Sequence, residues 1–187
     1  SMVGSYLNKR TIFTHKGTYG HANLIGGSRG KIGAAVLMTR AASFSGAGLI
    51  TATVPSVGLE ILQTMVPVAM CDDAYGKDVL EGKIQVEARF TYGVGSGIGT
   101  SRETAQFLGE FLKQVNRPVV IDADAINCIA QNPEMLEDLP ENSILTPHVK
   151  EFRGLAGETK NSHEQLALLT EFSIKHKVYI VLKDART

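Results

Sequence analysis

The stretch from His21 to Val54, HANLIGGSRGKIGAAVLMTRAASFSGAGLITATV, decides the fold class. It opens with a short apolar run that ends at Gly26 and leads into a glycine-rich turn. Residues 32–44 then place small and bulky apolar residues at helical spacing, and every residue from 49 to 54 is β-branched or apolar. A strand of that kind is typical of a parallel sheet that is covered on both faces. The stretch therefore predicts a strand, a helix and a second, parallel strand.

Strands and helices continue to alternate after Val54. The sequence predicts further strands at 66–71, 88–94, 118–121, 143–145 and 178–182. It predicts helices at 57–64, 101–115 and 162–175. Residues 72–87 are polar and poorly patterned, which indicates an irregular insertion. This alternation is typical of right-handed β-α-β units in an open α/β fold, with a mostly parallel sheet and helices on both faces.

The size, charge and cysteine content of the chain limit the class of protein to which it can belong. With 187 residues it is long enough for one substantial core, and we expect a single domain over residues 1–187. Nineteen basic and nineteen acidic residues cancel, so we expect no nucleic-acid partner and no anionic membrane surface. Cys71 and Cys128 are too few and too far apart for a disulfide framework or a zinc site. No apolar run reaches transmembrane length, and a cytoplasmic location is expected. Ser1 and Met2 are interpreted as a cloning remnant and play no part in the fold.

Four polar or glycine-rich clusters follow predicted strands. They begin after Ile25, Val94, Ile121 and Leu145. In parallel α/β sheets, ligands bind beyond the carboxyl ends of the strands, and these ends share one edge. One cleft can therefore collect all four clusters.

The cluster at residues 146–152 reads TPHVKEF. Thr146 is predicted as the N-cap of a helix and Pro147 as its first residue, where a missing N–H costs nothing. The amides of that first turn would face outward, and helix N-termini attract anions such as phosphate. Glu151 is a candidate ligand for Mg²⁺ beside that anion. The alternative interpretation is a capped helix start with His148 at the surface.

Several common nucleotide and catalytic motifs are absent from the sequence. The run after Ile25 is not a Walker A loop, because Ile25 occupies the position of its first glycine and Ile32 that of its Mg²⁺-binding hydroxyl. The glycines at 95–99 do not form a dinucleotide fingerprint, because the third glycine position falls on Thr100. No G-x-S-x-G elbow, plausible Ser-His-Asp order or His-Glu zinc motif occurs. A nucleotide site in this chain is therefore of another kind.

An ordered set of motifs runs from His15 to the end of the chain. The motifs are residues 15–22 (HKGTYGHA), 33–35 (GAA) with 45–49 (SGAGL), 95–100 (GSGIGT), 122–127 (DADAIN), 146–152 (TPHVKEF) and 181–187 (VLKDART). In number and order they resemble the ADP/ATP-dependent NAD(P)H-hydrate dehydratases of the ribokinase-like superfamily. The resemblance implies a ribokinase-like three-layer sandwich.

The resemblance also implies a metabolite-repair enzyme. Its substrate would be the hydrated nicotinamide cofactor, NADHX or NADPHX, whose damaged ring carries a hydroxyl. Family members phosphorylate that hydroxyl and then eliminate phosphate, which is a better leaving group than hydroxide. ADP or ATP would be the co-substrate and Mg²⁺ the cofactor, and a base must take the hydroxyl proton.

The family motifs assign Ala34, Gly97 and His148 to binding of the hydrated dinucleotide. Each residue also has a purely structural alternative. Ala34 suits close packing between a helix and the sheet, Gly97 suits a turn, and His148 suits an exposed helix start. The alternatives stay open at the level of sequence.

The resemblance places the adenine nucleotide and the metal elsewhere along the same edge. The residues expected on the nucleotide side are Lys183, Asp184, Ala185, Arg186 and Thr187. Glu151 would organise Mg²⁺ or phosphate through water. Asp122 and Asn127 are further candidates for metal or phosphate, although Asp122 also suits a helix cap.

Two departures from the family pattern stand out. Gly95-Ser96-Gly97 replaces a usual Gly-Pro-Gly, and Asp184 replaces a common glycine. The family's G-x-G-D segment, which carries the catalytic aspartate, has no counterpart, so the catalytic residue is expected downstream of Thr187. The apolar strand at 178–182 is expected inside the sheet, where it would need a covering helix. We therefore expect the chain to be the N-terminal portion of a longer catalytic domain, lacking its C-terminal part.

The segment before the first strand contains His15, Lys16 and Tyr19. It is interpreted as a solvated arm, a subunit contact or a lid on the cofactor. The resemblance favours the subunit contact, because family members assemble as homo-oligomers, commonly tetramers.

Two other functions remain open. One is a ribokinase-like kinase for a vitamin precursor, which shares the fold and the phosphate chemistry. The other is a non-catalytic nucleotide-binding module, which the missing G-x-G-D segment favours. Both alternatives keep the same edge of the sheet as the site.

Overall fold

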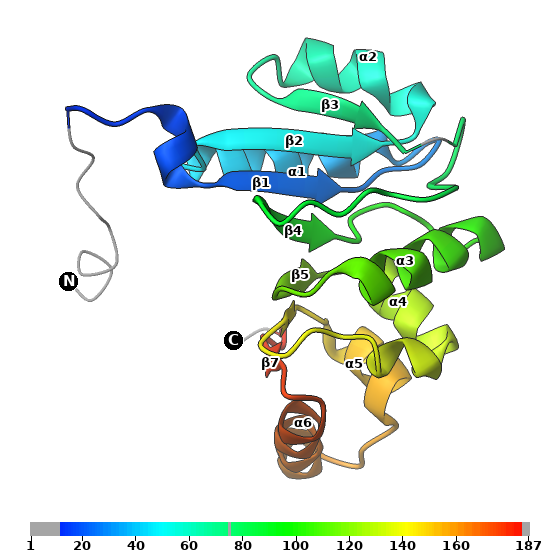
Figure 1. The fold of residues 1–187 in the computed structure, drawn as a ribbon. Coiled ribbons are helices and arrows are strands. Elements are labelled where there is room, and N and C mark those ends of the chain that lie inside the picture. Colours follow the sequence, from blue (N-terminus) through cyan, green and yellow to red (C-terminus); the bar gives the residue numbers. More distant parts are fainter. Residues whose placement is uncertain (1–11, 75, 185–187) are drawn as a thin grey trace.

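A seven-stranded parallel sheet with the order β3-β2-β1-β4-β5-β6-β7 forms the centre of the computed structural model, which describes residues 12–74 and 76–184 (Figure 1). The strands are β1 (His21–Ile25), β2 (Leu49–Val54), β3 (Met70–Asp73), β4 (Phe90–Val94), β5 (Val119–Ile121), β6 (Ile144–Leu145) and β7 (Tyr179–Ile180). Every neighbouring pair is parallel. The predicted α/β class is confirmed.

Helices connect the strands. They are η2 (Lys16–Tyr19), α1 (Ile32–Phe44), α2 (Ser56–Met65), α3 (Arg102–Gln114), α4 (Asp124–Gln131), η3 (Pro133–Leu136), α5 (Val149–Ala156) and α6 (Ser162–His176). The bounds of α1 and β2 are those that the sequence predicts. None of the helices in the described ranges is both long and apolar enough to cross a bilayer.

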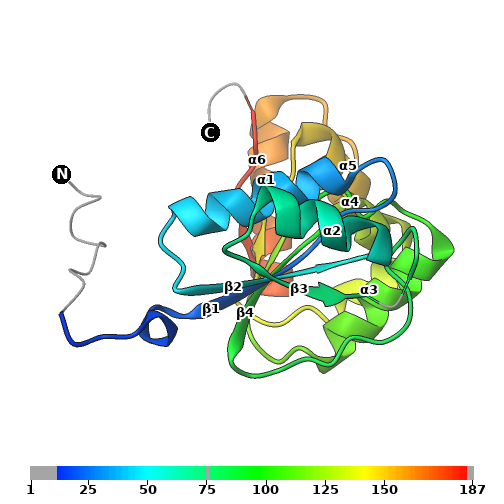
Figure 2. The same cartoon turned by 90° about the horizontal axis from the view of Figure 1, so that it is seen from above.

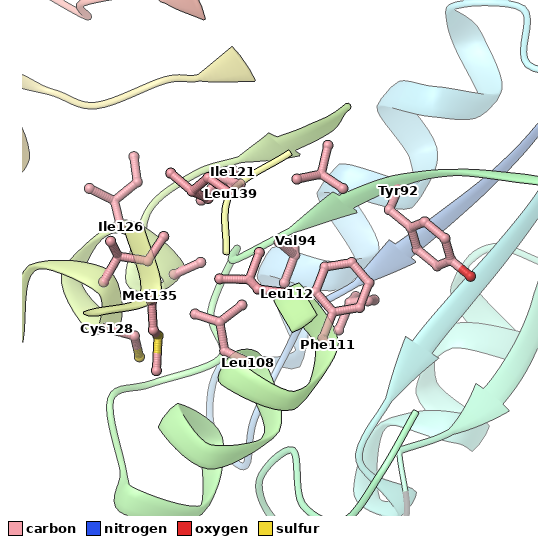
Figure 3. Packing of buried hydrophobic residues seen from close by; sticks show 14 of the residues in the cluster. Tyr92, Val94, Leu108, Phe111, Leu112, Ile121, Ile126, Cys128, Met135 and Leu139 are labelled. Atoms are coloured by element: carbon pink, nitrogen blue, oxygen red, sulfur yellow. The ribbon is translucent and has the colours of Figure 1, made fainter. Parts of the chain in front are cut away.

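The larger core lies on the face of the sheet that α3, α4 and α5 cover. Tyr92 and Val94 on β4 and Ile121 on β5 point into it, and the Tyr92 ring meets the Phe111 ring edge-on at 5.2 Å between centroids (Figure 3). Phe172 of α6 extends the same cluster. This packing fixes the carboxyl ends of the central strands relative to the helices that start there.

Helices α1 and α2 cover the opposite face, but only over part of its width (Figure 2). Leu24 and Ala52 are buried under them. The same row of the sheet continues through Val120 on β5 to Tyr179 on β7, and these side chains are 39% and 61% exposed. The described residues thus leave this half of the face open.

The structure corrects two predicted strands. β3 begins at Met70, four residues later than predicted, because residues 66–69 form a turn in which Ala69 N donates to Val66 O. The last strand is shorter than predicted, and it lies at the edge of the described sheet and not inside it. The predicted insertion between β3 and β4 is irregular as expected, and its Leu80 and Ile84 enter the larger core.

Candidate functional site

The carboxyl ends of β1 and β4 are joined by hydrogen bonds between their glycine-rich loops. Gly27 N donates to Ser96 O at 2.9 Å, and the Ser28 hydroxyl donates to Gly97 O at 2.8 Å. Ser28 is buried. Two of the four predicted clusters therefore form one continuous loop surface.

Gly97 and Ala34 are in direct contact on this surface. A Cβ placed on Gly97 would lie 2.8 Å from the Ala34 Cβ and 2.9 Å from Lys31 O. Gly97 also has a φ of +71°, which favours glycine. The structure thus brings together two of the three residues predicted to bind the dinucleotide.

The ends of β4 and β5 are equally close. A Cβ on Gly95 would lie 1.8 Å from Asp122 O, so only glycine fits there. Ala123, which follows Asp122, has a φ of 50° and a ψ of −123°. This is an unusual conformation for a non-glycine residue. This turn separates the side chains of Asp122 and Asp124 and directs them to different partners.

Asp124 faces the glycine-rich loops. Its Oδ2 accepts a hydrogen bond from Gly99 N at 2.8 Å and lies 3.2 Å from the Lys31 ammonium. Sequence reasoning did not single out Ser28, Lys31 or Asp124 as site residues. In the sequence, Lys31 stood out only as part of the glycine-rich run after Ile25, which does not fit a Walker A loop.

Asp122 faces the other side of the edge. Its Oδ1 accepts the Thr146 hydroxyl at 2.8 Å and lies 2.5 Å from the Lys183 ammonium. The ends of β5, β6 and β7 are therefore linked through one carboxylate. All four predicted clusters lie along the same edge, as expected.

Thr146 is not the N-cap of the following helix. The hydroxyl that would cap is bonded to Asp122, and the helix begins at Val149 with His148 as its N-cap. Pro147 accordingly lies before the helix and not in its first turn. The predicted helix start was wrong by two residues.

His148 and Glu151 form a reciprocal capping box. The Nδ1 atom of His148 accepts the Glu151 N–H at 3.0 Å, and Glu151 Oε2 accepts the His148 N–H at 2.8 Å. The His148 side chain is 51% exposed, whereas that of Glu151 is 6% exposed. His148 is thus at the surface of the edge, while Glu151 is buried beneath it.

The remaining predicted residues lie at different places. Asn127 lies in the first turn of α4, and Lys183 and Asp184 are exposed after β7. Ala185, Arg186 and Thr187 lie outside the described residues. Lys183 N donates to Pro147 O at 2.8 Å, which places the start of the predicted nucleotide segment beside the His148 helix.

No three His, Cys, Asp or Glu side chains within residues 12–74 and 76–184 gather into a metal site. Mg²⁺ commonly uses only one or two carboxylates and takes its other ligands from substrate phosphates and water. Asp122 at the edge fits that mode, although it already holds Lys183. Glu151 fits it less well because its carboxylate caps α5.

Cys128 lies just beneath the site without taking part in it. Its thiol donates to Gly99 O at 3.6 Å, and burial raises its pKa to about 11. A thiol that stays protonated is a poor nucleophile, so Cys128 serves as a packed side chain.

Two regions lie apart from the edge. The turn η2, formed by Lys16 to Tyr19, packs at the opposite, amino end of the strands, where Gly48 N donates to Tyr19 O (Figure 1). An open groove of about 1010 Å³ lies along α3 and η3, and none of the predicted site residues lines it.

The family model described as NAD(P)H-hydrate dehydratase matches residues 22–187. The bifunctional NAD(P)H-hydrate repair enzyme of Moorella thermoacetica is 32% identical over 193 residues, which cover 98% of this chain and 36% of that protein. The ADP-dependent (S)-NAD(P)H-hydrate dehydratase of Lactococcus lactis is 34% identical over 158 residues, which cover 83% of this chain and 56% of that protein. The chain thus spans between about a third and just over half of the length of these two curated relatives.

A solved structure shares the fold. It is a ribokinase-like superfamily protein from Enterococcus faecalis, with a TM-score of 0.75 and 26% identity. The match covers 95% of this chain and 62% of that chain. The predicted ribokinase-like architecture is confirmed.

Proposed function

Because the chain belongs to the NAD(P)H-hydrate dehydratase family, we propose that it forms the binding edge of an enzyme that converts NADHX or NADPHX to NAD(P)H with ADP or ATP. The observation that carries the proposal is the hydrogen-bonded edge itself. It consists of two sets of contacts: Ser28 joins the glycine loops of β1 and β4, and Asp122 joins Thr146 to Lys183. The name of the Lactococcus lactis relative supports ADP as a co-substrate.

The proposed chemistry explains why such an edge is needed. The ring hydroxyl attacks the terminal phosphorus of the nucleotide, a base takes its proton, and the nucleotide leaves with one phosphate fewer. The new phosphate ester then loses phosphate from its ring carbon and a proton from the neighbouring ring carbon to a base or to water, which restores the double bond of the reduced ring. Gly95 and Gly97 let the loops pack directly against Asp122 and Ala34 at this edge, and the cations Lys31 and Lys183 suit the negative charge of a diphosphate.

The proposed binding sites lie next to each other along this edge. Ala34, Gly97 and His148 would contact the hydrated dinucleotide. Lys183 and Asp184, with residues 185–187 beyond the described range, would contact the adenine nucleotide. Ala34 and Gly97 lie beside the Lys31–Asp124 pair, whereas His148 lies beside Lys183 and its partner Asp122, so the two ligands would meet near His148.

Mg²⁺ would be held at the same edge, mainly through the phosphates of the nucleotide. Asp122 and Asn127 are the proposed protein groups, and Glu151 would act only through a water molecule because it caps α5. When bound, the ion would neutralise charge on the transferred phosphoryl group.

The catalytic base is proposed to lie in a segment beyond Thr187, so that this chain is the N-terminal portion of a longer catalytic domain. The open half of the sheet face supports the proposal, because inner strands of parallel sheets are normally covered on both faces. We further propose a cytoplasmic homo-oligomer, with a tetramer as the expected state.

The proposal is tested with the full-length parent protein. It is incubated with NADHX and either ADP or ATP in the presence of Mg²⁺, and the absorbance of the reduced nicotinamide ring is followed. Return of that absorbance, with nucleotide required, is the expected result. Absence of binding to both NADHX and adenine nucleotide at millimolar concentration would contradict it. Phosphorylation of a vitamin precursor instead would identify a ribokinase-like kinase.

A further inference from the structure

The N-terminus of α5 has an uncommon cap. Ser, Thr, Asp and Asn are the usual N-cap residues, since a short side-chain oxygen reaches the amide two or three residues on. Here the ring nitrogen Nδ1 of His148 accepts the Glu151 N–H at 3.0 Å. The ring of His148 is therefore fixed by the backbone of its own helix.

The backbone of His148 is held from three directions. Its N–H donates to Glu151 Oε2 at 2.8 Å, and its carbonyl accepts from Phe152 N at 2.9 Å. An isolated parallel bridge pairs it with Lys183. Phe152 is 1% exposed in the larger core. His148 therefore presents its ring from a rigid position.

The cap also decides which ring nitrogen carries the proton. A neutral imidazole has one nitrogen that donates and one that accepts. Because Nδ1 accepts an amide N–H, the proton must be on Nε2. Nε2 lies 3.4 Å from Glu151 Oε1, so the buried carboxylate favours the same tautomer.

We infer that Glu151 is a positioning residue that holds His148 as the Nε2–H tautomer, so that His148 donates a hydrogen bond to an oxygen of the hydrated dinucleotide. The inference rests on the proposed function for the identity of that ligand. An acceptor oxygen of a phosphate or a carboxamide has the required chemistry. His148 in this state has no free lone pair on the ring, and therefore it does not act as the base.

The tautomer can be measured on the 187-residue chain without any ligand. Two-bond ¹⁵N–¹H correlation spectra of the histidine rings distinguish Nε2–H from Nδ1–H at neutral pH. The expected result is a dominant Nε2–H form for His148 in the wild type and in Glu151→Gln. Glu151→Gln keeps an amide oxygen that accepts the His148 N–H. Glu151→Ala keeps the backbone N–H that Nδ1 accepts but loses both contacts of the carboxylate with His148, so the cap is expected to open and give a mixture of tautomers. A dominant Nδ1–H form in the wild type, or no change in Glu151→Ala, would overturn the inference.

The same variants separate positioning from metal binding when NADPHX is titrated with Mg²⁺ and ADP present. A positioning role predicts affinity within about twofold of wild type for Glu151→Gln and about tenfold weaker binding for Glu151→Ala. Equal losses in the two variants would mean that the negative charge matters, and would overturn the inference. His148→Asn is the matched control, because Asn keeps a good N-cap but removes the Nε2–H donor. It is expected to lose about tenfold in affinity and to stay folded.

The two experiments distinguish failure of the inference from failure of the proposed function. If no variant binds NADPHX, including the wild type, the proposed function fails. The tautomer spectra still test the role of Glu151 in that case, since they need no ligand.

Discussion

Gly97 is the residue at which fold and proposed site depend on each other most directly. Its positive φ would strain any other residue, and the space for a side chain is already filled by Ala34. Gly99 is a natural comparison, because its φ is +75° but nothing lies within 4 Å of a Cβ built there. The two glycines therefore separate backbone strain from crowding.

Gly99→Ala is expected to lower the free energy of unfolding by about 1 kcal/mol, which is the cost of a left-handed alanine. Gly97→Ala should cost at least about 1 kcal/mol more, because the new methyl group also meets the Ala34 Cβ. Urea denaturation of both variants measures the difference. Equal losses would show that the loop moves away from Ala34 without cost.

At the scale of elements, the bounds of helices and strands were predicted best where one local sequence pattern dominates. The bounds of α1 and β2 were correct because a small-residue helix and a strand of β-branched and apolar residues are separated by glycines. The start of α5 was wrong because the Thr146 hydroxyl bonds to Asp122, a partner 24 residues away in sequence. A cap prediction from neighbouring residues cannot include such a contact. The candidate edge was predicted as a whole for a simpler reason, since all parallel strands end on one side.

The link between the ends of β5 and β7 gives a prediction about Lys183. Its side chain is 45% exposed and that of Asp122 is 35% exposed. Ion pairs of this kind contribute little, so Lys183→Met should change the free energy of unfolding by less than about 1 kcal/mol. Its affinity for ADP, measured by calorimetry, should fall about tenfold, because a cation beside the phosphates is lost.

Lys177→Met is the control for this prediction. Lys177 pairs with Glu141 before β7 begins, at the other end of the strand from Lys183. The affinity for ADP should therefore not change. A titration of Lys183→Met that overlays the wild type would remove Lys183 from the proposed nucleotide site.

For the whole molecule, two histidines make stability depend on pH. Burial, with a smaller contribution from the Arg89 charge, lowers the pKa of His21 below its ordinary value of 6.5. Burial, together with the nearby Lys175 charge, lowers the pKa of His176 in the same way. The unfolded chain then binds more protons than the folded chain in this range.

The free energy of unfolding is therefore expected to be greatest above about pH 6.5 and to fall as the pH drops from there through the folded pKa values. Urea denaturation at several pH values between about 7.5 and 5 measures the slope of the free energy of unfolding against pH. His21→Gln should reduce it, since Gln does not titrate and can still reach the Thr51 hydroxyl that His21 contacts at 2.9 Å. A slope of the opposite sign would contradict the assignment.

The half of the sheet face that the described residues leave open also has a consequence at this scale. Val120, Tyr179 and Val181 are 39%, 61% and 43% exposed. Apolar surface on a sheet favours association, so the 187-residue chain should show a mass that rises with concentration in sedimentation experiments. Tyr179→Lys with Val181→Lys should reduce that rise. Leu166→Lys, on α6, is the control and should leave it unchanged. Equal reduction by the control would mean that association does not use this face.

The docking of η2 against the start of β2 has a practical consequence for measuring these affinities. Lys16 lies at the amino end of the strands, a full strand length from the edge where the lysines and glycines gather. A sensor-chip linker joined at position 16 would hold every molecule in one orientation, with the proposed binding edge toward the flowing solution.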